Sequence, residues 1–257
     1  MADMVQGAVV HDRRVALITG AAGAIGGATA HRLAQDGYAL ALADLWPAGE
    51  GPALPEGLRL TLDVRSTEQV NAAVDQTLAA FGRIDLLVNV AGITSFGSAQ
   101  DLPEGEWARV LDINLTGTFR CCQAVVPAMK AQGRGRIVNL GSVLGKNGGN
   151  TRPWIDASEQ RASGNIAYGV SKAGVHTMTA YLAKELASSG ITVNAVAPGP
   201  VSSKMTTDLP PTIRSLIPVG RMGRPEDVAA VVAFLASDEA GFVTGEVIDV
   251  NGGMWCD

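Results

Sequence analysis

Short, continuously apolar segments alternate with helix-like segments along almost the whole chain, and this alternation restricts the folds open to it. The helix-like segments span residues 27–36, 67–81, 106–130 and 168–189, and a further one begins at Pro225. The apolar segments span residues 14–19, 38–43, 58–62, 84–89, 136–140, 191–196 and 246–250. Strands that are apolar on both faces and alternate with helices are typical of a parallel sheet covered on both sides. We therefore expect an α/β fold, with a doubly wound parallel sheet of about seven strands and helices on both faces.

The chain shows no internal repeat, linker or low-complexity block, so we expect residues 1–257 to form a single domain. Residues 1–12 form a mixed leader that we expect to be partly disordered. A chain of this length buries roughly three quarters of the surface it exposes when unfolded. It therefore needs neither disulfides nor a structural metal to hold its fold.

Charge and cysteine content argue against several functional classes. A net charge of −5 with interspersed acids and bases speaks against nucleic acid and anionic membranes as partners. Cys121 and Cys122 are adjacent in a helix-like segment, and we expect them to be buried packing residues in a reducing compartment. His11, His31 and His176 are scattered, so no metal site is predicted. Without a signal segment or a long apolar run, the chain is expected to be soluble and cytoplasmic.

A tyrosine and a lysine open the helix-like segment at 168–189. Tyr168 and Lys172 are four residues apart, so one helical turn places both on a common face. An ammonium beside a phenol favours the phenolate and lowers the tyrosine pKa towards neutrality. Such a tyrosine is suited to general acid–base chemistry on alcohols and carbonyls. The alternative, an ordinary surface pair, stays open on these two residues alone.

A glycine-rich turn joins the first apolar segment to the first helix. Residues 20–26 read Gly-Ala-Ala-Gly-Ala-Ile-Gly, and Asp44 ends the second apolar segment. Such a turn lets backbone N–H groups approach a pyrophosphate, and an acid about 20 residues further on holds the adenosine ribose. Because a carboxylate repels a 2′-phosphate, Asp44 predicts NAD rather than NADP. The alternatives are a turn kept only for close packing and an ordinary strand-end acid.

Taken together, these residues resemble the short-chain dehydrogenase/reductase family in its single-domain branch. The resemblance runs from about Arg14 to Gly253, and its motifs stand in family order at strand ends. Those motifs are Thr19-Gly20 with Gly26, Asp63-Val64, Asn89-Val90-Ala91-Gly92, Asn114, Ser142, Tyr168 with Lys172, Pro198-Gly199 and Asn251-Gly252-Gly253. The resemblance implies a Rossmann-like dinucleotide-binding and catalytic domain.

The resemblance also implies a role for each matching residue. Tyr168 would donate or accept the hydroxyl proton, Lys172 would lower its pKa and hold the nicotinamide ribose, and Ser142 would bind the substrate oxygen. Asn114 would hold a water that links Lys172 to solvent. The other cofactor-binding residues would be Gly20, Gly23, Ala24, Ile25, Gly26, Asp44, Asp63, Val64, Asn89, Ala91, Gly92, Pro198, Val201 and Ser203.

The chain departs from the family pattern at several places. Ala24 stands where most members carry glycine, Val90 replaces a common asparagine, and Ser203 replaces a commoner threonine. Ser142 and Tyr168 lie 26 residues apart, well beyond the usual separation.

The extra residues fall within 146–165 and contain Arg152, Trp154 and Arg161. We expect these three to bind an acidic group or a ring of the substrate, the alternative being a surface or subunit-contact loop. Residues 202–221 resemble the family's mobile substrate loop.

The main interpretation is an NAD-dependent oxidoreductase that moves a hydride between nicotinamide and a secondary alcohol or ketone. A polyol, sugar or hydroxy acid is the expected small-molecule substrate. One alternative is an enzyme like 3-oxoacyl-(acyl-carrier-protein) reductase, although Asp44 weighs against it because such reductases usually take NADP. A second alternative is a non-catalytic dinucleotide sensor. The resemblance also implies a homotetramer, built partly from the helices at 106–130 and 168–189.

Overall fold

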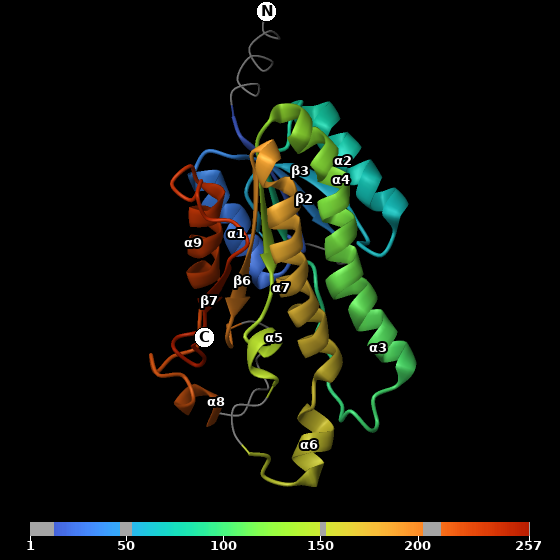
Figure 1. Ribbon diagram of the computed structural model, residues 1–257, viewed down its shortest axis with the longest axis vertical. Coiled ribbons are helices and arrows are strands. Elements are labelled where there is room, and N and C mark those ends of the chain that lie inside the picture. The colour runs from blue at the N-terminus through green and yellow to red at the C-terminus, as the bar shows by residue number, and fades with distance from the viewer. Residues whose placement is uncertain (1–12, 47–52, 150–152, 203–211, 257) are drawn as a thin grey trace, which may run out of the picture.

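The computed structural model describes residues 13–46, 53–149, 153–202 and 212–256, and they build one parallel sheet between two helical layers (Figure 1). The strand order is β3-β2-β1-β4-β5-β6-β7, and every pairing is parallel. The strands are β1 (Val15–Thr19), β2 (Ala39–Asp44), β3 (Leu58–Thr61), β4 (Leu86–Asn89), β5 (Gly135–Leu140), β6 (Ile191–Pro198) and β7 (Val247–Val250). The predicted Rossmann-like single domain is confirmed.

Helices cover both faces of the sheet. One layer holds α1 (Ala24–Gln35) and α9 (Pro225–Ala236), and the other holds α2 (Thr67–Phe81), α4 (Gly117–Gln132) and α7 (Ile166–Leu186). Each layer packs on its own apolar cluster, with Leu33 and Val232 in the first and Val74 and Val125 in the second. The central strands β1 and β4 are buried along their whole length because both of their faces meet a helical layer.

The chain reverses its direction across the sheet between β1 and β4. β1 leads to β2 and β3 on one side, and β4 leads to β5, β6 and β7 on the other. Thr19 and Asn89 pair at the carboxyl ends of β1 and β4, and Asn89 pairs with Asn139 of β5. Ligands of such sheets bind at the carboxyl ends of the strands, where the order reverses.

Three of the predicted helices have different limits in the structure, and one of them, α7, spans Ile166–Leu186 rather than 168–189. α1 begins at Ala24 rather than residue 27, because Gly20, at φ 68°, turns the chain at once. The segment predicted as one helix at 106–130 divides into α3 (Glu104–Leu111), a π-helical turn η1 (Asp112–Thr116) and α4. The π turn adds a residue to the helix and changes the direction of the side chains within it.

The structure also contains short helices that the sequence did not predict. They are α5 (Leu144–Asn147), α6 (Ala157–Ser163) and α8 (Thr212–Ser215). The last residues of the helix predicted at 168–189 form a 3₁₀ turn, η2 (Ala187–Ser189). α5 and α6 both lie between Ser142 and Tyr168. The extra residues that separate this serine and tyrosine therefore form two short helices.

Burial of the two adjacent cysteines is confirmed. Cys121 and Cys122 are buried residues of α4, and burial raises the pKa of the Cys121 thiol to about 12. Within the described part of the chain, no helix is both long and apolar enough to span a membrane, and no three potential metal ligands gather. The leader at 1–12, Arg152 and Ser203 lie outside the described residues.

Candidate active site

Tyr168 and Lys172 lie together in the first turns of α7. The Nζ atom of Lys172 is 5.7 Å from the centroid of the Tyr168 ring. The lysine side chain is only 4% exposed, and its Nζ donates a 2.7 Å hydrogen bond to the carbonyl of Leu140 at the end of β5. The ammonium is therefore fixed between the helix and the sheet rather than free on the surface.

Ser142 follows the end of β5 and lies beside Tyr168. Its hydroxyl forms a hydrogen bond with the phenol of Tyr168 and accepts the N–H of Leu144 at 3.2 Å. Ser142 is buried, so this contact is shielded from water. The structure thus brings together the serine, tyrosine and lysine that the sequence selected, although the serine is distant in the chain.

The predicted lowering of the Tyr168 pKa by Lys172 is wrong for the protein on its own. Burial raises the pKa of Tyr168, and the hydrogen bond from Ser142 opposes that rise only in part. The same burial lowers the pKa of Lys172 to about 8. The physical reason is that low-dielectric surroundings disfavour both charged forms, while the ammonium lies over the ring.

Asn114 occupies the π turn and is completely buried. Its side-chain oxygen accepts the N–H of Ile93 at 2.8 Å, and its amide donates to the Ile93 carbonyl at 2.9 Å and to the Ser171 hydroxyl at 3.0 Å. A methyl group built on Gly92 would lie 3.3 Å from this oxygen and 3.5 Å from the Lys172 Nζ. Asn114 therefore lies on the same side of the site as the lysine.

The glycine turn has the geometry of a phosphate cradle. Gly20 adopts φ 68°, and a Cβ atom on Gly26 would lie 2.1 Å from the Gly20 carbonyl oxygen. Gly23 precedes α1 in an extended conformation, so Ala24 and Ile25 form the first turn of the helix, which contains no acidic side chain. The turn thus presents helix N-terminal N–H groups without a side chain in the way, which suits a pyrophosphate.

Gly26 gives a direct test of this close packing. Gly26→Ala is expected to destabilise the fold by about 1–3 kcal/mol and to weaken NADH binding at least about tenfold, because the new methyl group meets backbone atoms. Gly27→Ala is the matched control, since its methyl group would meet the Leu54 side chain at 3.4 Å and the Ala21 carbonyl oxygen at 3.7 Å, without a clash. Urea unfolding and NADH fluorescence titration measure both effects. Equal behaviour of the two variants would refute the cradle.

Asp44 holds the turn from the end of β2. One carboxylate oxygen accepts the N–H of Ala22 at 2.8 Å, and the other accepts the N–H of Leu45 at 2.7 Å. Asp44 remains partly exposed. Asp44 therefore places a partly exposed carboxylate next to the glycine turn.

The remaining predicted cofactor residues lie at the carboxyl ends of neighbouring strands. The guanidinium of Arg65 lies 2.6 Å from a carboxylate oxygen of Asp63, and this ion pair lowers the pKa of the Asp63 carboxyl group. Val64 packs against Gly117. The side chain of Asn89 donates to Asn139 in the interior, and the N–H of Ala91 donates to the Thr19 hydroxyl. The Asn89 side chain therefore joins β4 to β5 within the sheet.

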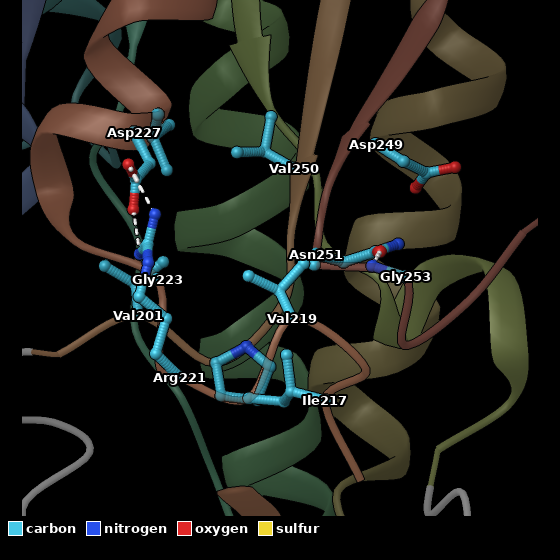
Figure 2. A pocket seen from close by; sticks show the side chains of 13 residues that line it. Val201, Ile217, Val219, Arg221, Gly223, Asp227, Asp249, Val250, Asn251 and Gly253 are labelled. Atoms are coloured by element: carbon cyan, nitrogen blue, oxygen red, sulfur yellow. Dashed lines mark hydrogen bonds and ion pairs between the residues drawn. The ribbon is translucent and has the colours of Figure 1, made fainter.

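Pro198 is the last residue of β6, and Val201, which follows the strand, borders a cavity of about 280 Å³ (Figure 2). Val201 pairs with Gly223, and Arg221 forms an ion pair with Asp227 on the wall of this cavity. The segment after β6 is thereby joined to the first turn of α9.

The insertion encloses a second cavity, of about 480 Å³. Trp154 lines it, whereas Arg161 is exposed on α6. From α7 the lining includes Ile166, Val170 and Ala173, which turn away from Tyr168 and Lys172 on the helix. Leu144 and Gly145, which follow Ser142, also line this cavity, and the contact of Trp154 with the substrate stays a prediction.

One residue that contacts the site was not predicted from the sequence. The Nε2 atom of His176 accepts the backbone N–H of Ser142 at 3.3 Å. His176 was considered only as a metal ligand, yet it lies one helical turn beyond Lys172, on the face that carries the site. The four-residue spacing from the lysine was the available signal.

Comparison with known proteins supports the same family. A family model described as enoyl-(acyl carrier protein) reductase matches residues 20–255. A 3-oxoacyl-[acyl-carrier-protein] reductase FabG of Thermotoga maritima is 41% identical over 252 residues, which cover 94% of this chain and 97% of the relative. A (2S)-[(R)-hydroxy(phenyl)methyl]succinyl-CoA dehydrogenase subunit BbsD of Thauera aromatica is 40% identical, covering 93% and 96%.

A solved structure gives an independent comparison. The crystal structure of gox2181 superposes with a TM-score of 0.83 at 36% identity, covering 95% of this chain and 96% of that chain. The match therefore includes the sheet, both helical layers and the strand ends that carry the site. The chain belongs to the short-chain dehydrogenase/reductase family and is an oxidoreductase of that family.

Proposed function

We propose that this enzyme reduces a 3-oxoacyl thioester to the 3-hydroxyacyl thioester, with NADH as the hydride donor. The observation that carries the proposal is an assembled Tyr168, Lys172 and Ser142 in a chain that resembles acyl-thioester enzymes over nearly its whole length. This replaces the polyol, sugar or hydroxy-acid substrate as the main interpretation. Both relatives are named for acyl groups carried on acyl carrier protein or coenzyme A.

The protonation state of Tyr168 favours the reductive direction. Because burial raises its pKa, the phenol keeps its proton at neutral pH and can donate it to a carbonyl oxygen. Ser142 donates a hydrogen bond from the same side and stabilises the negative charge that develops on that oxygen. A nicotinamide cofactor held beside these residues would supply the hydride for the carbonyl carbon. Lys172 then keeps a cationic group beside the tyrosine while the phenol recovers its proton.

The residues around the glycine turn fit a dinucleotide. Gly20, Gly23 and Gly26 leave its backbone open, and α1 begins directly behind it. Asp44 would bind the adenosine ribose. Its charge disfavours a 2′-phosphate, and this is our reason for proposing NAD.

Asp44→Asn tests the cofactor preference. For the wild type, kcat/KM with NADH should exceed that with NADPH at least about tenfold, and the asparagine should reduce this ratio about tenfold. Asparagine keeps an oxygen that can accept the Ala22 N–H but removes the charge, so the turn is retained. Asp36→Asn, a change to an exposed carboxylate at the end of α1, is the control. A wild type that prefers NADPH would contradict the assignment of NAD.

The reaction itself is tested with a panel of substrates. NADH oxidation is followed with acetoacetyl-CoA, a 3-oxoacyl thioester of acyl carrier protein, and a set of ketoses and simple ketones. We expect the thioesters to give kcat/KM values at least about 100-fold above the ketoses. A preference for the ketoses would contradict the proposed thioester substrate and favour a polyol or sugar substrate instead. The homotetramer and the cytoplasmic location remain predictions, and sedimentation analysis and cell fractionation would check them.

A further inference from the structure

We infer that His176 is a positioning residue, which fixes Ser142 by accepting its backbone N–H. The inference rests on the proposed function for its kinetic test. It starts from the way in which β5 ends. N–H groups of odd-numbered residues there point to β6, since Gly141 donates to the Val196 carbonyl and Val143 to the Pro198 carbonyl. Arg136, an even-numbered residue, donates to the Asp85 carbonyl on the β4 side.

The N–H of Ser142 follows the even-numbered pattern and points to the β4 side, but β4 ends at Asn89. The imidazole of His176 provides the acceptor that a longer β4 would have provided, since its Nε2 accepts this N–H at 3.3 Å. Ser142 is only 5% exposed, so water does not readily replace such an acceptor. The hydrogen bond therefore continues the sheet by one residue and holds the serine at its end.

Two glycines make room for the ring. A Cβ atom on Gly141 would lie 2.1 Å from the His176 Nε2, and one on Gly145 would lie 2.9 Å from its Cε1. Any other residue at these positions would force the imidazole to move. The histidine is thus seated between the end of β5 and α5, against backbone on two sides.

Two successive turns of α7 hold the end of β5. Lys172 donates to the Leu140 carbonyl, and His176 accepts from the Ser142 N–H. The helix that carries the tyrosine and lysine therefore also sets the position of the serine. A neutral imidazole that accepts at Nε2 carries its proton on Nδ1, so the hydrogen-bond network assigns one tautomer.

Substitution at His176 tests the inference. His176→Leu should lower kcat about 10- to 100-fold with little change in the Kd for NADH, because the variant misplaces Ser142 and leaves the cofactor site unchanged. His176→Gln keeps an acceptor and should restore kcat to within about fivefold of the wild type. Thr177→Leu, an exposed neighbour on the same helix, should leave kcat unchanged. A His176→Leu enzyme with wild-type kcat would overturn the inference.

A second measurement does not depend on turnover. Nitrogen-15 NMR of the wild type should show His176 as the Nδ1–H tautomer, and the Ser142 amide resonance should shift in His176→Gln but not in Thr177→Leu. An Nε2–H tautomer would overturn the inference even if His176→Leu failed to fold. A wild type that reduces no thioester would instead overturn the proposed function, and the tautomer would still decide the role of His176.

Discussion

Tyr168→Phe is expected to lower kcat about 1,000-fold while changing the Kd for NADH less than about threefold. The phenylalanine ring keeps the packing beneath the Lys172 ammonium but removes the hydroxyl that contacts Ser142. The loss falls on kcat because the proton is transferred only in the chemical step. Stopped-flow kinetics and NADH titration measure the two quantities separately.

Tyr181→Phe provides the matched control for this prediction. Tyr181 lies on the same helix and is 75% exposed, so its hydroxyl should contribute nothing to turnover. If Tyr168→Phe retained more than about a tenth of wild-type kcat, the hydroxyl would not be the proton donor. If it instead lost NADH binding, its main role would be in the cofactor site.

Lys172→Met is expected to lower kcat about 100-fold and to remove a pH dependence of stability. Burial lowers the lysine pKa from 10.5 to about 8 in the folded chain. Between these two pH values the unfolded chain binds more protons than the folded chain, so rising pH favours folding. Below pH 8 the buried Lys172 ammonium lowers the free energy of unfolding by its full amount, and above pH 10.5 this destabilisation is absent.

Relative to Lys172→Met, the unfolding free energy of the wild type should therefore rise by about 3 kcal/mol between pH 8 and 10.5. The comparison with the variant cancels other groups that titrate in the same range. Lys184→Met, at an exposed position of the same helix, should follow the wild type. Parallel pH profiles of wild type and Lys172→Met in urea unfolding would contradict burial of a charged lysine.

The sequence predicted the sheet well because each strand is a short apolar segment bounded by polar or glycine residues. Seven such segments appeared as seven strands, and Ser142 and Tyr168 were predicted correctly as neighbours from family motifs. Those motifs stand at strand ends, whose position in a parallel sheet is set by topology. The site could be predicted to that extent because topology, rather than side-chain detail, brings these residues together.

Two features depended on tertiary contacts and could not be predicted. The π turn at Asp112–Thr116 accompanies the insertion of the Asn114 side chain between Ile93 and Ser171, which are distant in the sequence. The direction of the Tyr168 pKa shift depends on burial, which a four-residue spacing does not reveal.

The insertion was predicted only as a loop. Its helix α6 follows Asp156, whose side chain accepts the N–H groups of Ser158 and Glu159 and so caps the start of the helix. Trp154 lines the cavity beside α7, and its contact with the substrate stays a prediction.

The most direct test of the account follows a labelled hydride into the product. The wild type is incubated with NADH that carries deuterium on the transferable position, together with acetoacetyl-CoA, and the product is analysed by mass spectrometry and NMR. The account predicts 3-hydroxybutyryl-CoA with one deuterium on carbon 3, and almost none with Tyr168→Phe. Unchanged acetoacetyl-CoA, or equal product from Tyr168→Phe, would contradict it.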